Sequence, residues 1–265
     1  MKKIFILGHN GMLGNAVLKY YRSKNNYILY TAETRFDSEE FKTELKNSDA
    51  EYIINCIGKI PQKSKNNEDL NEYKTLNIEL PIFLESLGKK ILHPSTDCEF
   101  LGDLEESKKY NKNSVRDAKD EYGLSKSYIS EKIEKDFVNT KILRVSIIGH
   151  EKNTFLSLLD WFLSQEKETN GYTNHYWNGI TTLEWSKISY KIVSDWNSYP
   201  VLNTFGTEEI NSKYQLLKVI KEVYGKEIII NEYKTPNTVN KCMESDIVIP
   251  NIKTQLVELK SFYAK

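Results

Sequence analysis

The fold is decided by the opening stretch Lys3-Ile4-Phe5-Ile6-Leu7-Gly8-His9-Asn10-Gly11-Met12-Leu13-Gly14. Its first five residues form a short apolar run, which predicts a buried parallel strand that ends at Gly8. From Met12 to about Arg22 the apolar residues recur at helical spacing, so a helix follows the turn directly. Residues 26–31 are β-rich again. The chain therefore opens with a strand–turn–helix–strand unit.

The same alternation continues over the first 150 residues. Further strands are expected at 52–57, 90–93 and 141–145, and further helices at 37–45 with Asp37 as N-cap, at 70–87 with a kink at Pro81, and at 121–137. Residues 101–120 are polar and predict an exposed loop. Strands alternating with helices are typical of an α/β fold, a Rossmann-type doubly wound parallel sheet.

After Gly149 the pattern loosens. Helices are expected at 155–163, 185–196 and 214–224, and a strand at 227–230. No linker rich in proline, glycine or serine separates the two halves. We therefore expect a sheet domain over 1–150 and a smaller C-terminal region over 151–265, interleaved with the first rather than independent.

Composition excludes several classes of protein. The 265 residues contain 37 basic and 37 acidic side chains, so no global charge favours nucleic acid or an anionic membrane. No apolar run approaches the roughly 18 residues needed to span a bilayer, and the N-terminal apolar stretch is shorter than the roughly 7–15 residues of a signal peptide. The three cysteines and four histidines have no metal-ligand spacing. We expect a cytoplasmic protein without metal, nucleic-acid or membrane partners.

The glycine turn predicts a phosphate site. Gly8 permits the tight turn, Gly11 lets backbone amides approach a pyrophosphate, and Gly14 lets the helix pack closely on the sheet. The N-terminus of the helix would offer free N–H groups and its dipole to the phosphates. The alternative is a structural turn that binds no ligand.

Two residues after the second strand bear on the kind of dinucleotide. Glu33 could accept hydrogen bonds from the adenosine ribose, which favours NAD(H), whereas Arg35 could pair with a 2′-phosphate, which favours NADP(H). We give NADP(H) a slight preference because Arg35 is one of only four arginines. A surface ion pair is the alternative role for Arg35.

Tyr122 and Lys126 lie four residues apart at the start of a predicted helix, so their side chains share one face. A nearby ammonium lowers the pKa of a phenol, and such a tyrosine can protonate a carbonyl oxygen as a hydride reaches the carbon. Thr96 ends the fourth strand, where its hydroxyl could bond that oxygen. The alternatives are a solvated helix face for the pair and a cap for Thr96.

These segments, in this order, resemble the extended short-chain dehydrogenase/reductase superfamily, and more narrowly the dTDP-4-dehydrorhamnose reductase family. The resemblance covers roughly the first 150 residues. It rests on five segments: Ile6–Gly14, Ile53–Gly58, Ser95–Phe100, Tyr122–Lys126 and Ile142–Ser146.

The resemblance implies roles for single residues. Tyr122 would be the acid/base, Lys126 would tune it and anchor the cofactor ribose, and Thr96 would contact the carbonyl, with Asp97 beside the substrate. The cofactor contacts that it implies come from Gly8, Asn10, Met12, Leu13, Cys56, Ile57, Gly58 and Asn77.

The segment 170–182 stands where relatives build the sugar-nucleotide site. Its aromatic, amide and hydroxyl side chains include the candidate substrate residues Trp177, Asn178 and Thr181, with ordinary loop packing as the alternative. Lys59 or Lys63 could supply a cation for a diphosphate.

The resemblance thus implies an NAD(P)H-dependent reductase of a nucleotide-linked 4-keto-6-deoxy sugar, with a homodimer left open. One alternative is an epimerase or dehydratase that recycles bound NAD, for which Asp97 and Glu99 could form an acidic pair. The alternative of another class is a non-catalytic regulatory subunit that binds the cofactor.

Overall fold

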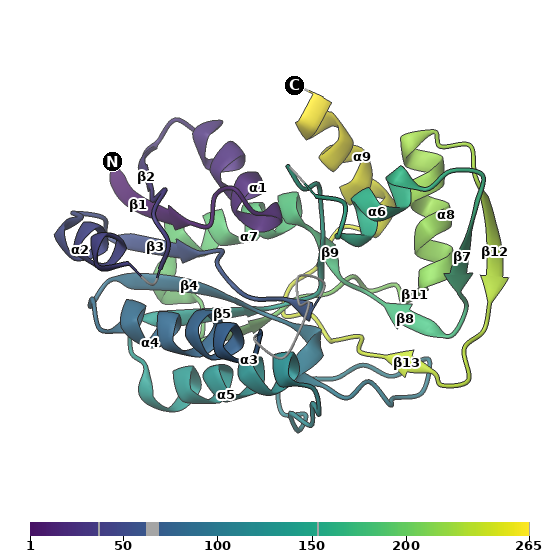
Figure 1. Ribbon diagram of the computed structural model, residues 1–265, viewed down its shortest axis with the longest axis horizontal. Coiled ribbons are helices and arrows are strands. Elements are labelled where there is room, and N and C mark those ends of the chain that lie inside the picture. Colours follow the sequence, from purple (N-terminus) through teal and green to yellow (C-terminus); the bar gives the residue numbers. More distant parts are fainter. Residues whose placement is uncertain (37, 62–68, 153, 265) are drawn as a thin grey trace.

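The computed structural model describes residues 1–36, 38–61, 69–152 and 154–264 (Figure 1). Its first half alternates strands and helices, as the hydrophobic pattern predicts. The elements of that half are β1 Lys2–Leu7, α1 Met12–Arg22, β2 Tyr27–Thr31, α2 Glu39–Asn47, β3 Tyr52–Asn55, α3 Asp69–Glu72, α4 Leu80–Glu85, β4 Lys90–Ser95, α5 Glu121–Asp136 and β5 Thr140–Arg144.

The second half contains shorter strands and several helices. Its elements are β6 Ile147–Ile148, α6 Leu158–Ser164, β7 Glu168–Tyr172, β8 His175–Trp177, β9 Ile180–Thr181, α7 Thr182–Ser194, β10 Leu202–Thr204, β11 Asn211–Ser212, α8 Lys213–Tyr224, β12 Ile229–Tyr233, β13 Val239–Asn240 and α9 Ile252–Ala264.

A six-stranded sheet in the order β10-β5-β4-β3-β1-β2 forms the centre, and its neighbouring strands all run parallel. This confirms the predicted Rossmann-type fold. β2 pairs with one side of β1 and β3 with the other side, so the strand order reverses at β1. In such sheets, ligands bind outside the carboxyl ends of the strands at the point of reversal.

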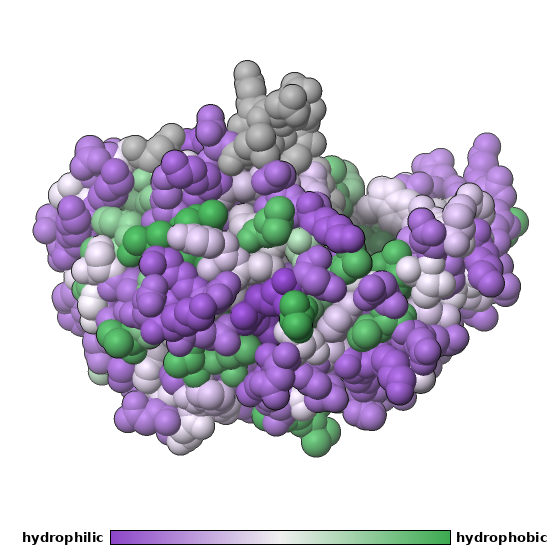
Figure 2. All heavy atoms as spheres, turned by 90° about the horizontal axis from the view of Figure 1, so that it is seen from below, coloured by the Kyte–Doolittle hydropathy of each residue, from purple (hydrophilic) through white to green (hydrophobic). Residues whose placement is uncertain are grey.

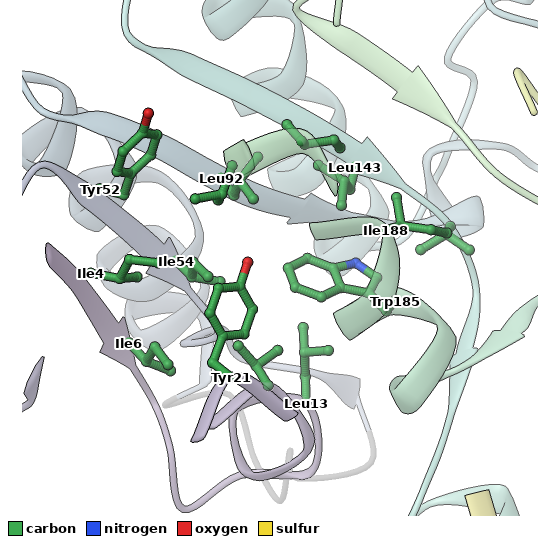
Figure 3. Close-up of a cluster of buried hydrophobic side chains, with 14 of the residues drawn as sticks. Ile4, Ile6, Leu13, Tyr21, Tyr52, Ile54, Leu92, Leu143, Trp185 and Ile188 are labelled. Carbon is green, nitrogen blue, oxygen red and sulfur yellow. The ribbon is translucent and has the colours of Figure 1, made fainter. Parts of the chain in front are cut away.

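Helices cover both faces of this sheet, because its strands alternate apolar side chains between the two faces. On one face α1 and α7 pack against β1, β3, β4 and β5. Figure 3 shows this cluster, with the labelled residues Ile4, Ile6, Leu13, Tyr21, Tyr52, Ile54, Leu92, Leu143, Trp185 and Ile188. On the other face Phe5 and Leu7 pack with α2 and α4.

The C-terminal region is built from a three-stranded sheet in the order β11-β8-β13, the pair β12-β7, and helices α6, α8 and α9. Figure 1 shows β7, β12 and α8 at one end of the molecule, and the surface is indented beside this lobe (Figure 2). The chain also returns to the first sheet, because β10 pairs with β5 and α7 packs on α1.

The helix expected at 70–87 is divided into α3, a π-helical segment Tyr73–Glu79, and α4. Pro81 lies in the first turn of α4. Proline has no N–H to donate to a carbonyl one turn earlier, so the ordinary helical ladder cannot continue there. The N–H of Leu80 instead donates to the carbonyl of Thr75, five residues back. In place of the kink that was expected at Pro81, the chain changes from π-helix to α-helix just before the proline.

The expectation of an exposed loop at 101–120 was wrong in part. Tyr110 is buried and stacks on Phe100 with ring centroids 4.1 Å apart. The loop also forms isolated bridges from Asp103 to Asn240 and from Tyr110 to Met243. This segment is therefore held by the C-terminal part of the chain.

Other differences concern helix caps and elements that the sequence pattern missed. Asp37 lies outside the described residues, and the side chain of Ser38 caps α2 by accepting from the N–H of Phe41. The sequence pattern predicts neither the short strand β10 nor the C-terminal helix α9. None of the helices in the described parts of the chain is both long and apolar enough to cross a membrane.

Candidate active site

A cavity of about 340 Å³ lies at the carboxyl ends of β1, β3, β4 and β5. That volume is within the range of small-molecule sites. Its walls come from the glycine turn, the loop after β3, the end of β4, helix α5, the segment after β5, and the C-terminal region. The lining includes Gly11–Leu13, Cys56–Pro61, Pro94–Cys98, Tyr122, Lys126, Val145–Ile148, Glu151, Leu156–Leu158, Trp177 and Lys213.

The glycine turn has the backbone geometry that a phosphate site requires. Gly8 has a φ of +72°, and a Cβ on Gly14 would lie 2.2 Å from the carbonyl oxygen of Gly8. Gly11 is the N-cap of α1 and supplies no side-chain cap, so the first N–H groups of the helix are not capped by a side chain. Gly11, Met12 and Leu13 also line the cavity. A dinucleotide pyrophosphate therefore fits this turn.

Alanine substitutions should separate the packing role of this turn from its binding role. We expect Gly14→Ala to cost about 1–3 kcal/mol of stability, because the new methyl group meets backbone atoms of the turn. Gly11→Ala should leave the melting temperature nearly unchanged, since its Cβ would lie 3.4 Å from the nearest atom, the carbonyl oxygen of Gly8. Thermal unfolding of both variants checks this. Equal melting temperatures would contradict it.

Tyr122, Lys126 and Thr96 converge on the cavity. Asp120 caps α5 by accepting from the N–H of Gly123, which places Tyr122 in the first turn of the helix. The Lys126 ammonium lies 3.0 Å from the carbonyl oxygen of Pro94, to which it donates. The Thr96 hydroxyl accepts from the N–H of Cys98 at 3.1 Å and donates to the carboxylate of Asp97 at 3.0 Å. Thr96 is therefore a cap, and it also lies close enough to Tyr122 to lower the pKa of its phenol.

Burial shifts the two titrating groups of this site. The pKa of the Tyr122 phenol is raised above its usual value, first by burial and then by the charge of Cys98, while the hydrogen bond with Thr96 lowers it. The spacing of Tyr122 and Lys126 alone predicts the opposite, a lowered pKa of the phenol. Burial lowers the pKa of Lys126 to about 8, against the negative charge of Glu99, which raises it. Tyr122 is thus a protonated phenol at neutral pH.

Asn77 holds the loop after β3 against α5. Its side-chain oxygen accepts from the N–H of Lys59 at 2.9 Å, and its amide donates to the carbonyl of Lys59 and to the hydroxyl of Ser125, each at 3.1 Å. A Cβ on Gly58 would lie 3.3 Å from the Asn77 oxygen and 3.9 Å from the Lys126 nitrogen. The π-helical segment therefore places Asn77 between the loop after β3 and α5, near Lys126.

Glu99 lies beneath the site and does not line the cavity. It is fully buried, and its carboxylate accepts from the hydroxyl groups of Ser95 and Ser130, and pairs with Arg144 at 2.7 Å and with Arg116 at 2.6 Å. The acidic pair of Asp97 and Glu99 that a dehydratase would use is therefore not assembled, because Glu99 is committed to two arginines.

Eleven of the candidate site residues lie on the cavity wall: Gly11, Met12, Leu13, Cys56, Ile57, Gly58, Thr96, Asp97, Tyr122, Lys126 and Trp177. Asn10 accepts a hydrogen bond from Lys152 at 3.1 Å at the turn. Arg35 is exposed beyond β2, and Glu33 pairs with His9 of the turn at 3.1 Å. Lys59 lines the cavity and pairs with Glu72, and Lys63 lies outside the described residues.

Two candidate substrate residues are used to hold the fold together. The Asn178 amide donates to the carbonyls of Thr207 and Met243 and accepts from the N–H of Met243. Thr181 is fully buried and caps α7 through the N–H of Glu184. The structure does not bring either side chain to the cavity. The reason is that residues 178–182 are buried: β9 pairs with β6 and leads directly into α7, so this segment is not a surface loop.

Lys213 is one of the cavity residues that the sequence pattern missed, together with Glu151 and Leu156–Leu158. It begins α8, and its ammonium lies 5.4 Å from the ring centroid of Trp177. The only local signal is Ser212 before it, which predicts a helix start and no binding role. Within the described parts of the chain, no group of three or more histidine, cysteine or acidic side chains could hold a metal ion.

Comparisons with known proteins agree with the fold described above. A family model described as RmlD substrate binding domain matches residues 1–220. No curated protein sequence matches the chain. Among solved structures, a dTDP-4-dehydrorhamnose reductase from Clostridium acetobutylicum shares 17% identity, with a TM-score of 0.79 over 99% of this chain and 100% of its own.

Two further solved structures have the same fold. A dTDP-4-dehydrorhamnose reductase from Bacillus anthracis, in complex with NADP, has a TM-score of 0.81 at 15% identity, over 98% of this chain and 99% of its own. A dTDP-glucose 4,6-dehydratase from Bacillus anthracis, in complex with NAD, has a TM-score of 0.78 at 14% identity, over 100% of this chain and 97% of its own. At these identities the likeness shows a shared fold.

Proposed function

The chain belongs to the family described as RmlD substrate binding domain, and on this premise we propose that it is an NAD(P)H-dependent reductase of a nucleotide-linked keto sugar. The observation that carries the proposal is one cavity that holds both an uncapped glycine turn and the group Thr96, Tyr122 and Lys126. A phosphate-binding turn beside a proton donor suits hydride chemistry on a carbonyl compound.

The residues of this chain would divide the work as follows. The amides of the glycine turn would bind the cofactor pyrophosphate, Lys126 would bond the nicotinamide ribose, and Asn77 would hold Lys126 in place. The cofactor, when bound, supplies the hydride. Thr96 would orient the ketone oxygen, and Tyr122 would donate its phenolic proton to that oxygen, so that the ketone becomes an alcohol.

The finer parts of the proposal are a 4-keto-6-deoxy sugar as substrate and NADP(H) as the slightly preferred cofactor. The dTDP-4-dehydrorhamnose reductases among the structural relatives support the first. Arg35, exposed beyond β2, supports the second. Asp97 and Trp177 line the cavity beside the proton donor and would contact the sugar.

The decisive experiment follows the oxidation of NADPH and of NADH at 340 nm with dTDP-, UDP- and GDP-linked 4-keto sugars. We expect one nucleotide class to be reduced, with NADPH at least as good a donor as NADH. A purified protein that binds neither coenzyme would overturn the proposal. NAD that stays bound through purification would instead identify an epimerase or dehydratase, and stimulation of a partner enzyme without reduction would identify a regulatory subunit.

The lowered pKa of Lys126 predicts a pH profile. A protonated Lys126 stabilises the phenolate that forms as Tyr122 gives up its proton, and the raised pKa of Tyr122 keeps the phenol protonated at neutral pH. We therefore expect kcat/KM for reduction to be level between pH 6 and 7 and to fall above about pH 8, by up to about tenfold per pH unit. A profile that rises from pH 7 to 9.5 would contradict this role of Lys126.

A further inference from the structure

Lys213 has features of a binding residue rather than of a structural one. It lines the cavity as the first residue of α8, so it belongs to the wall that the C-terminal region supplies. Its ammonium faces the indole of Trp177, which also lines the cavity. Trp177 is fixed in turn, since its ring N–H donates to the hydroxyl of Ser146 at 2.9 Å. The position of the cation is therefore set by a rigid aromatic surface.

The other charged groups of the cavity already have partners, including Asp97, which accepts from the hydroxyl of Thr96 at 3.0 Å. Lys59 pairs with Glu72, and Lys126 donates to the carbonyl of Pro94. Glu151 accepts from the N–H groups of Leu156 and Ser157.

Lys213 differs from these groups. Within the described part of the chain it makes no ion pair within 4.0 Å and no hydrogen bond through its ammonium. Asp97, Cys98 and Cys242 are the ionisable groups that act on it at longer range. Burial lowers the pKa of Lys213, and the charge of Asp97 opposes that shift. Lys213 is only partly exposed, and a half-buried cation without a paired anion is stabilised by a ligand that supplies the negative charge.

We propose that Lys213 binds an anionic oxygen group of the substrate, at the cavity wall that the C-terminal region supplies. This rests on the proposed function, because a nucleotide-linked sugar carries such oxygens. The anion can come from two sources, the diphosphate of the nucleotide or a carboxylate on the sugar. Both would use the same charge-assisted hydrogen bond to the ammonium. Lys213 would then determine which substrates the cavity accepts.

The test is equilibrium binding by calorimetry to the full chain, with UDP, dTDP, UDP-glucose and UDP-glucuronate as probes. Lys213→Met should weaken binding of the anionic probe by about 10- to 100-fold, as expected for one charge-assisted hydrogen bond. Lys213→Arg should restore most of it. Lys218→Met is the matched control, because Lys218 lies on the same helix, is exposed, and packs over the ring of Tyr214 outside the cavity.

The probes distinguish the two sources of charge. A loss shared by UDP or dTDP and by both UDP-sugars identifies the diphosphate, whereas a loss confined to UDP-glucuronate identifies a sugar carboxylate. The affinity of the wild-type chain should also weaken as pH rises through the lowered pKa of Lys213, a dependence that Lys213→Met should lack.

Unchanged binding in Lys213→Met, or equal losses in Lys213→Met and Lys218→Met, would overturn the proposal. So would a wild-type chain that binds none of the four probes. Titration of the same samples with NADPH tests the proposed function separately, because the glycine turn before α1 and Lys213 of α8 belong to different walls of the cavity.

Discussion

Replacing Tyr122 with phenylalanine should slow reduction of the keto sugar by about 10²- to 10⁴-fold while leaving coenzyme affinity nearly unchanged. The variant keeps the aromatic ring, which lies 6.1 Å from that of Tyr73, so the wall of the cavity keeps its shape. It removes the hydroxyl that lies near Thr96 and that would donate the proton. Single-turnover oxidation of NADPH measures the rate of the chemical step, and fluorescence titration measures coenzyme binding.

The control is Tyr128→Phe. Tyr128 lies on the same helix, and its side chain is exposed, so losing its hydroxyl should change neither rate nor stability. Turnover of Tyr122→Phe at the wild-type rate would show that another group gives the proton. A parallel loss of coenzyme affinity would show that the hydroxyl acts in binding rather than in proton transfer.

Much of the sheet could be predicted from sequence because several of its strands contain local apolar runs. β1 at Lys2–Leu7 contains the run Ile4–Leu7 and β3 at Tyr52–Asn55 the run Tyr52–Ile54, and the predicted α1 matches the observed Met12–Arg22. β10 was missed because its three residues, Leu202–Thr204, include two polar side chains. Their strand conformation is fixed by pairing with β5, which lies some sixty residues earlier in the chain.

The shared location of Thr96, Tyr122 and Lys126 could also be predicted from local sequence patterns. Tyr122 and Lys126 share a helix, and Thr96 ends a strand, so local spacing and strand polarity bring them to one edge. No local spacing rule predicts which residues of the C-terminal region line the cavity. Lys213 lines the cavity, whereas Asn178 bonds Met243 away from it. Both positions depend on contacts between segments far apart in the chain, which no local periodicity predicts.

The buried ion network beneath the site makes a second large effect expected. Glu99→Gln should lower stability by about 3–5 kcal/mol, because Arg144, which is 1% exposed, would lose the carboxylate that balances its charge. For a chain of this length that corresponds to a fall of about 6–20 °C in melting temperature. Circular dichroism during thermal unfolding measures it. Glu131→Gln is the control, because its pair with Lys135 is exposed and should contribute under about 0.5 kcal/mol.

A double variant decides whether charge or packing causes the loss. Glu99→Leu combined with Arg144→Met removes both buried charges, and Arg116 retains Glu134 as its partner. We expect this protein to unfold at a higher temperature than Glu99→Gln, because an apolar pair leaves no uncompensated charge in the interior. If the double variant is instead the less stable of the two, lost packing rather than an uncompensated charge causes the effect. If Glu99→Gln melts with the wild type, the ion network does not stabilise the fold. Since Thr96 and Glu99 bound the same short turn, a true charge effect should also reduce turnover in Glu99→Gln below its unfolding temperature.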